Sequence, residues 1–172
     1  FVLVTIHRDI NTDDIYRLRA ILSTLKILAE EYSMPFVMPF HPRTANILKR
    51  YLKDLYDELN SCGFIRIIPP VSYLEMILLE MSCRLIITDS VGVQKESHFF
   101  RKPCIVLRKE TEWTELITNK TARLADADPE LIKNEFTTFM HSDSELQYPA
   151  FYGNGKSAEF ILNEILFTFG KD

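Results

Sequence analysis

The most informative stretch of the chain runs Leu85-Ile86-Ile87-Thr88-Asp89-Ser90-Val91-Gly92-Val93-Gln94-Lys95-Glu96-Ser97. Its apolar half is typical of a buried parallel strand, and the residues that follow the turn favour a helix. The first N–H groups of a helix have no partner within the helix, and the helix dipole favours negative charge there. Ser90 adds a hydroxyl donor, and Glu96 follows about one and a half turns into the helix. The stretch therefore predicts a nucleotide diphosphate site, with a carboxylate placed for the neighbouring sugar hydroxyls.

Short β-branched runs alternate with longer helical runs along the rest of the chain. The expected strands are Val2–Ile6, Pro35–Phe40, Phe64–Ile68, Arg84–Thr88, Cys104–Leu107 and Ala122–Leu124. The expected helices are Asp13–Glu31, Thr44–Leu59, Tyr73–Met81, Val93–Phe100, Pro129–His141 and Ser157–Phe169, with Asn11, Thr12, Thr44, Ser72 and Asp128 as capping candidates. This alternation predicts right-handed crossovers and a doubly wound parallel α/β sheet. We expect a Rossmann-like domain over residues 1–150 and a helical tail over residues 151–172.

Composition narrows the class of protein. Of the 172 residues, 47% are hydrophobic and 26% are charged, which is ordinary for a globular domain. The net charge of −4 does not indicate general binding of nucleic acid, no apolar run approaches the length of a membrane helix, and the basic n-region of a signal peptide is missing. Three well-separated cysteines in mostly apolar contexts indicate reduced thiols in a cytoplasmic protein, and argue against disulfides or a zinc cluster. The chain opens on an apolar strand without an initiator Met, which suggests a piece of a longer protein.

Polar side chains follow five of the expected strands. In open α/β sheets, ligands bind beyond the carboxyl ends of the strands. These ends carry His7 and Arg8; His41 and Arg43; Val71 and Tyr73; Ser90, Val91 and Gly92; and Arg108, Thr111 and Glu112. Arginine suits bidentate binding of phosphate, and histidine can bind phosphate or transfer a proton. Their convergence predicts one ligand site at this edge.

Each of these residues also has a simpler interpretation. The arginines could pair with the nearby acids Asp9, Asp13 and Asp14, and Arg108 with Glu112 could be an ordinary ion pair. Ser90 could be only a helix cap, Glu96 a solvated helix residue, and Tyr73 part of the core.

Together the residues resemble the carboxy-terminal half of the non-hydrolysing UDP-N-acetylglucosamine 2-epimerase family. The matching segments are Val4-Thr5-Ile6-His7-Arg8 with Asn11, Pro39-Phe40-His41-Pro42-Arg43-Thr44, Pro70-Val71-Ser72-Tyr73, Thr88 to Glu96, Lys102-Pro103-Cys104, Leu107-Arg108, Thr111-Glu112-Trp113, and Tyr152-Gly153-Asn154-Gly155. Their order and spacing cover nearly the whole chain.

The resemblance implies one half of a GT-B-type fold, in which two doubly wound domains enclose a nucleotide sugar. It places the diphosphate on Ser90, Val91 and Gly92, and the ribose on Glu96. It places His41 on the phosphate side as a catalytic candidate. The other implied substrate-binding residues are Arg8 and Arg43 in the cleft, Val71 and Tyr73 at the uracil, and Arg108, Thr111 and Glu112 at the sugar.

The resemblance also implies a reaction and its partners. UDP is eliminated and added back, which inverts the carbon that bears the acetamido group and gives UDP-N-acetylmannosamine. The carboxylates that move the proton belong to the missing amino-terminal domain. That domain is also the expected partner of the tail, and the full-length protein is expected to be a homodimer. No cofactor, metal, nucleic acid or membrane is implied.

One departure from the family pattern lies within the diphosphate turn. Val91 stands where the family usually has a first glycine, and a valine accepts positive φ poorly and crowds a phosphate. Two alternatives therefore stay open: a GT-B-type glycosyltransferase domain that uses a UDP-sugar, and a non-catalytic UDP-sugar-binding module.

Overall fold

The computed structural model describes residues 1–141 and 146–170, so 142–145 of the expected domain and 171–172 of the expected tail lie outside it. Its described residues form a six-stranded parallel sheet in the order β3-β2-β1-β4-β5-β6. The strands are β1 (Val2–Thr5), β2 (Phe36–Pro39), β3 (Ile65–Ile68), β4 (Leu85–Thr88), β5 (Cys104–Val106) and β6 (Ala122–Leu124). The strand order reverses between β1 and β4, so the doubly wound prediction is confirmed.

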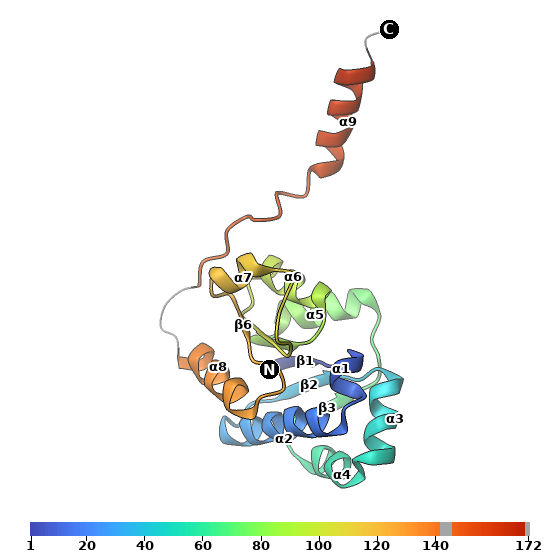
Figure 1. Cartoon of the computed structure of the whole chain (residues 1–172), viewed down its shortest axis with the longest axis vertical. Helices are drawn as coiled ribbons and strands as arrows, with labels where there is room; N and C mark the ends of the chain where they lie inside the picture. Colours follow the sequence, from blue (N-terminus) through green and yellow to red (C-terminus); the bar gives the residue numbers. More distant parts are fainter. Residues whose placement is uncertain (142–145, 171–172) are drawn as a thin grey trace.

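Helices cover both faces of the sheet (Figure 1). The covering helices are α1 (Asp9–Thr12), α2 (Ile15–Glu31), α3 (Pro42–Tyr51), α4 (Lys53–Ser61), α5 (Tyr73–Ser82), α6 (Val91–Phe99), α7 (Thr114–Thr118) and α8 (Pro129–His141), and a further helix, α9 (Ser157–Phe169), lies away from the sheet. Because the side chains of successive strand residues point to opposite faces of the sheet, β1 contributes side chains to two hydrophobic cores. Val2 and Val4 pack in the core that α2, α3, α4 and α8 cover, whereas Leu3 packs in the core under α5, α6 and α7.

The expected helix Thr44–Leu59 is wrong, because two helices occupy this range. The helical conformation is interrupted at Leu52, where φ is −132° and ψ is 44°. The Leu52 side chain is buried in the core at the break, so packing overrides the helical propensity of the flanking residues. The short helices α1 and α7 were not expected.

The helix caps agree with the sequence in part. Ser72 forms a capping box with Glu75, and Asp128 accepts from the Glu130 N–H at 2.9 Å, so both predictions are confirmed. The prediction that Asn11 or Thr12 caps the first long helix is wrong, because Asp14 caps α2 and both residues are buried in α1.

Thr44 is also not a cap. His41 caps α3, with its Nδ1 accepting from the Arg43 N–H at 3.3 Å. The Thr44 hydroxyl instead donates to the carbonyl oxygen of Ile6 at 3.1 Å, inside the core. Pro42 at the first helical position favours a helix start two residues before Thr44.

One buried carboxylate joins the ends of three central strands. Asp89 is 0% exposed and accepts from the backbone N–H groups of His7 at 3.1 Å and Arg8 at 3.0 Å. It also accepts from Asn11 Nδ2 at 3.0 Å, and the same amide donates to the Leu107 carbonyl at 3.0 Å. The loop after β1 is therefore held against the ends of β4 and β5.

This network extends outward through Arg17 of α2. Arg17 Nη2 donates to Asn11 Oδ1 at 2.9 Å and to Asp126 Oδ1 at 2.5 Å. Both members of the Arg17–Asp126 pair are about one-fifth exposed, so solvent screens them only in part. The pair connects α2 with the segment after β6.

Replacing Asp89 tests the first part of this network. We expect Asp89→Asn to lower the free energy of unfolding by about 3 kcal/mol, because an amide NH2 would face N–H groups that now donate to the carboxylate. Urea unfolding near neutral pH measures this loss. The matched control is Asp9→Asn in the same loop, where solvent screens the exposed ion pair with Arg43 and the loss of stability should be much smaller. Equal effects of the two substitutions would contradict the role of Asp89.

Replacing Asp126 tests the second part. The hydrogen bond from Arg17 holds the pKa of Asp126 below its ordinary value of 3.8. A lowered folded-state pKa stabilises the fold above the ordinary pKa, and this contribution is lost as pH falls through the folded-state value. Asn tolerates the positive φ of 50° at this position.

We therefore expect Asp126→Asn to cost about 1–2 kcal/mol near neutral pH. The difference from the unmutated protein should shrink as pH falls below 3.8. Urea unfolding over a pH series measures both quantities, and a pH-independent difference would assign the loss to packing rather than to charge.

Candidate functional site

The amino terminus of α6 lies at the topological switch point, beside the end of β1. Ser90 is its N-cap and its Oγ accepts from the Val93 N–H at 3.4 Å, so the capping interpretation of Ser90 is confirmed. No group in the described residues accepts from the N–H groups of Val91 or Gly92. These two donors and the Ser90 hydroxyl hydrogen lie where the sequence predicts an anion to bind, and they make a candidate anion site.

The expected backbone conflict at Val91 is wrong. Val91 is the first residue of α6 and has no positive φ. A Cβ added to Gly92 would meet only Ser90 Oγ, at 3.9 Å. The space beside Gly92 is therefore open to a ligand rather than filled by protein.

The ribose candidate lies further along α6. Glu96 is half-buried, and the Tyr73 hydroxyl approaches its Oε1 at 3.5 Å. Tyr73 is the first residue of α5 and is 67% exposed, so the interpretation of Tyr73 as a core residue is wrong. Val71, also half-buried, precedes it in the same loop. The structure therefore brings the residues expected at uracil and ribose to the flank of α6.

The loop after β5 is fastened to the first turn of α6. Thr111 Oγ1 donates to Gln94 Oε1 at 2.5 Å, and Gln94 is 0% exposed. Trp113 Nε1 donates to the carbonyl oxygen of Val91 at 2.8 Å. These contacts fix the loop that carries the sugar-end candidates against the anion site.

Arg108 and Glu112 form a bidentate ion pair, with N···O distances of 2.7 and 3.1 Å. The hydrogen bond raises the pKa of Arg108 and lowers that of Glu112. The ion-pair interpretation is therefore confirmed. The pair also holds Arg108 in one orientation, and three of its five N–H donors are not used by Glu112.

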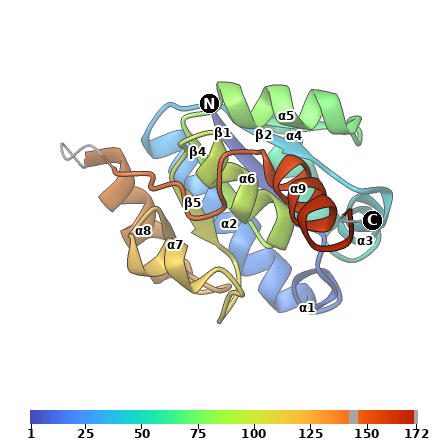
Figure 2. The same cartoon turned by 90° about the horizontal axis from the view of Figure 1, so that it is seen from above.

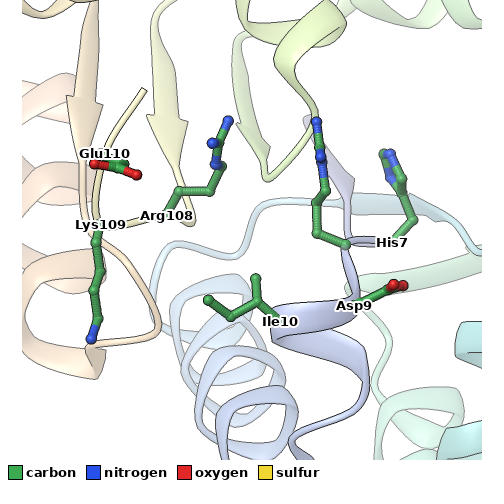
Figure 3. A pocket seen from close by; sticks show the side chains of 7 residues that line it. His7, Asp9, Ile10, Arg108, Lys109 and Glu110 are labelled. Atoms are coloured by element: carbon green, nitrogen blue, oxygen red, sulfur yellow. The ribbon is translucent and has the colours of Figure 1, made fainter. Parts of the chain in front are cut away.

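A hollow of about 750 Å³ lies between the ends of β1 and β5. Its lining residues are His7, Arg8, Asp9, Ile10, Arg108, Lys109 and Glu110. In Figure 3 the side chains of His7 and Arg108 project to the same side, whereas that of Lys109 points the opposite way. Within the described chain, no hydrogen bond or ion pair holds the Arg8 side chain, so its charge is available to a ligand in the hollow.

The end of β2 contributes less than expected. Arg43 pairs with Asp9 and Asp13, so the surface-pairing interpretation is confirmed for this arginine. His41 is exposed and its Nδ1 is occupied by the α3 cap. Neither residue lines the hollow, and Arg43 reaches it only through Asp9.

Sequence reasoning missed how the segment before α9 is anchored. His98 Nε2 is 2.7 Å from the Pro149 carbonyl oxygen. The Lys95 ammonium lies over the rings of Trp113 and Tyr152, 4.7 and 4.4 Å from their centroids. These contacts hold the segment against α6, on the same helix as the anion site. The density of aromatic residues near Pro149 was the available signal.

Helix α9 itself stands apart from the sheet and its covering helices (Figures 1 and 2). None of its residues is buried. Its exposed apolar side chains are Phe160, Ile161, Leu162, Ile165, Leu166, Phe167 and Phe169.

Two further properties concern the described residues only. They contain no group of three or more His, Cys, Asp or Glu side chains arranged to hold a metal ion. None of their helices combines the length and apolar character needed to span a bilayer.

Comparisons with known proteins agree with this geometry. A family model described as UDP-N-acetylglucosamine 2-epimerase matches residues 1–166. The chain is 38% identical over 165 residues to the UDP-2,3-diacetamido-2,3-dideoxy-D-glucuronate 2-epimerase of Pseudomonas aeruginosa, covering 94% of this chain and 43% of that protein. The chain thus spans less than half the length of this curated relative.

Solved structures give the same result. The UDP-GlcNAc 2-epimerase of Methanocaldococcus jannaschii, in complex with UDP-GlcNAc and UDP, matches at a TM-score of 0.85 and 35% identity, over 97% of this chain and 45% of that chain. An E. coli heptosyltransferase with ADP matches over 80% of this chain and 44% of that chain, at a TM-score of 0.58 and 14% identity, which shows the fold alone. This sheet is one half of a GT-B-type fold, and the chain belongs to the UDP-N-acetylglucosamine 2-epimerase family.

Proposed function

We propose that the protein containing this chain is a UDP-N-acetylglucosamine 2-epimerase and that this chain is its UDP-binding half. The observation that carries the proposal is the first turn of α6. Its Val91 and Gly92 N–H groups have no acceptor in the described residues, and space is open beside Gly92. Family membership over residues 1–166 supports UDP as the anion that they bind.

The other residues take their roles from their position around this turn. The Glu96 carboxylate accepts from the ribose hydroxyls, and Val71 with Tyr73 borders the uracil. Arg8 lines the hollow. Arg108, Thr111 and Glu112 meet the sugar from the loop that Gln94 and Val91 hold. His41 and Arg43 act from the phosphate side at the end of β2.

This arrangement serves the leaving group of the reaction. Loss of the proton from the sugar C2 and cleavage of the C1–O bond give a glycal and UDP. Re-addition of UDP, with return of the proton to the opposite face, gives the epimer. The N–H donors of α6 stabilise the charge that develops on the diphosphate as the bond breaks. The carboxylates that move the proton are supplied by the other half of the protein.

The rest of the protein explains the exposure of α9. We infer that the exposed apolar side chains of α9 pack against the other half, since none of the residues of α9 is buried. We further infer a homodimeric full-length protein. Cytoplasmic location is supported by Cys62, Cys83 and Cys104, which are all buried and free.

Nucleotide binding is tested by removing the ribose contact from either side. We expect Glu96→Gln to weaken UDP binding by about tenfold, because charge-assisted hydrogen bonds to the ribose are lost. The substitution should not change the affinity for 2′,3′-dideoxy-UDP, which lacks those hydroxyls. Calorimetric titration of the 172-residue chain measures both affinities. The matched control is Glu130→Gln on α8, where the glutamate side chain is 77% exposed. An equal loss for both nucleotides would contradict ribose binding by Glu96.

The reaction is tested on the full-length protein in heavy water. With UDP-N-acetylglucosamine and no acceptor, we expect the protein to form UDP-N-acetylmannosamine that carries deuterium at C2. Proton NMR measures both the product and the exchange. Free UDP formed only when an acceptor is present would indicate a glycosyltransferase instead. UDP-sugar binding without exchange or epimer would indicate a non-catalytic module.

A further inference from the structure

A second carboxyl group lies beside Glu96, fully inside the protein. Glu80 of α5 is 0% exposed. Neither of its carboxyl oxygens accepts a hydrogen bond from a donor within the part of the chain that the structure describes. An unpaired buried carboxylate is costly, so this group needs either a proton or a partner. In the sequence it looks like an ordinary helical glutamate.

The charged neighbour that acts on Glu80 is Glu96 of α6. Burial, followed by the charge of Glu96 and a hydrogen bond toward it, raises the pKa of Glu80 to about 8. Ionising two adjacent carboxyl groups costs electrostatic free energy because the like charges repel each other, so one group keeps its proton. Burial disfavours charge, so the more buried group is the one that keeps it. Glu80 is fully buried and Glu96 only half-buried, so Glu80 is the member that holds the proton.

The other groups near Glu80 do not supply a compensating charge. Burial raises the pKa of the Cys83 thiol to about 11 and that of the Cys104 thiol to about 12, so both stay neutral where Glu80 titrates. Lys102 and the chain's amino terminus act on Cys83 but do not offset the carboxyl of Glu80.

We propose that Glu80 is a positioning residue: a buried carboxylic acid that donates a hydrogen bond to Glu96 and so orients the Glu96 carboxylate toward the nucleotide's ribose. This inference rests on the proposed UDP-binding role of Glu96. The Tyr73 hydroxyl approaches Glu96 Oε1, and the two carboxylate oxygens together keep further lone pairs for the ribose hydroxyls. Deprotonation of Glu80 sets two like charges against each other and turns Glu96 away from this orientation.

The proton on Glu80 is tested without any nucleotide. Carboxyl carbon NMR of the 172-residue chain should show one glutamate that titrates near pH 8 and is absent from Glu80→Gln. A Glu80 midpoint near the ordinary 4.5 would overturn the proposal.

The positioning role is tested by UDP affinity over a pH series. Glu80→Gln keeps the volume and a donor but cannot ionise, so its affinity at neutral pH should stay within about twofold of the unmutated chain. Glu80→Met keeps the volume without a donor and should bind UDP about fivefold more weakly. Above the midpoint, the affinity of the unmutated chain should fall toward that of Glu80→Met, while that of Glu80→Gln should not. The nucleotide also titrates over this pH range, but it does so equally for every variant. The ratio of the UDP affinities of two variants at each pH therefore cancels the titration of the nucleotide.

The control is Glu75→Gln on the same helix, where a glutamine can still form the capping box. A Glu80→Met chain that melts normally and binds UDP as tightly as the unmutated chain at every pH would overturn the positioning role. If the unmutated chain binds no UDP at all, the proposed function fails and takes the positioning role with it. The carboxyl titration then still decides whether Glu80 holds a proton.

Discussion

The buried carboxylate of Asp89 is the interaction on which the site depends. The strands β1 and β4 are neighbours in the sheet because the strand order reverses between them. The loops that follow these two strands therefore leave the same edge of the sheet side by side. Asp89 accepts from the backbone of His7 and Arg8 and so holds that loop beside the α6 turn that begins one residue later. The donors of Arg8 and of α6 therefore face one region because one side chain satisfies the buried backbone between them.

The distribution of charge separates the groups that stabilise the fold from those left for a ligand. Arg43 and Arg108 are both held by carboxylates of this chain. The Arg8 side chain and the first N–H groups of α6 have no such partner among the described residues. Under the proposed function, a diphosphate would meet N–H groups of α6 that are already oriented, so little reorganisation would oppose binding. The paired arginines shape the approach to the site instead.

Local patterns predicted much of the fold, and long-range contacts account for the rest. The strand Ala122–Leu124 and the caps Ser72 and Asp128 depend on neighbouring residues, and each was predicted correctly. The break at Leu52 and the burial of Thr44 depend on packing against distant strands, which sequence periodicity does not reveal. The same holds for the site, because the partnership of Glu80 with Glu96 joins two helices across 16 residues of sequence. The anion turn was predictable because its donors belong to one continuous segment.

The central claim is that the first turn of α6 holds the diphosphate of UDP. A crystal structure of the 172-residue chain with UDP tests it most directly. The account predicts diphosphate oxygens within hydrogen-bond distance of the Val91 and Gly92 N–H groups and the ribose hydroxyls on Glu96. UDP bound elsewhere, such as in the hollow between Arg8 and Arg108 with the α6 turn empty, would contradict it.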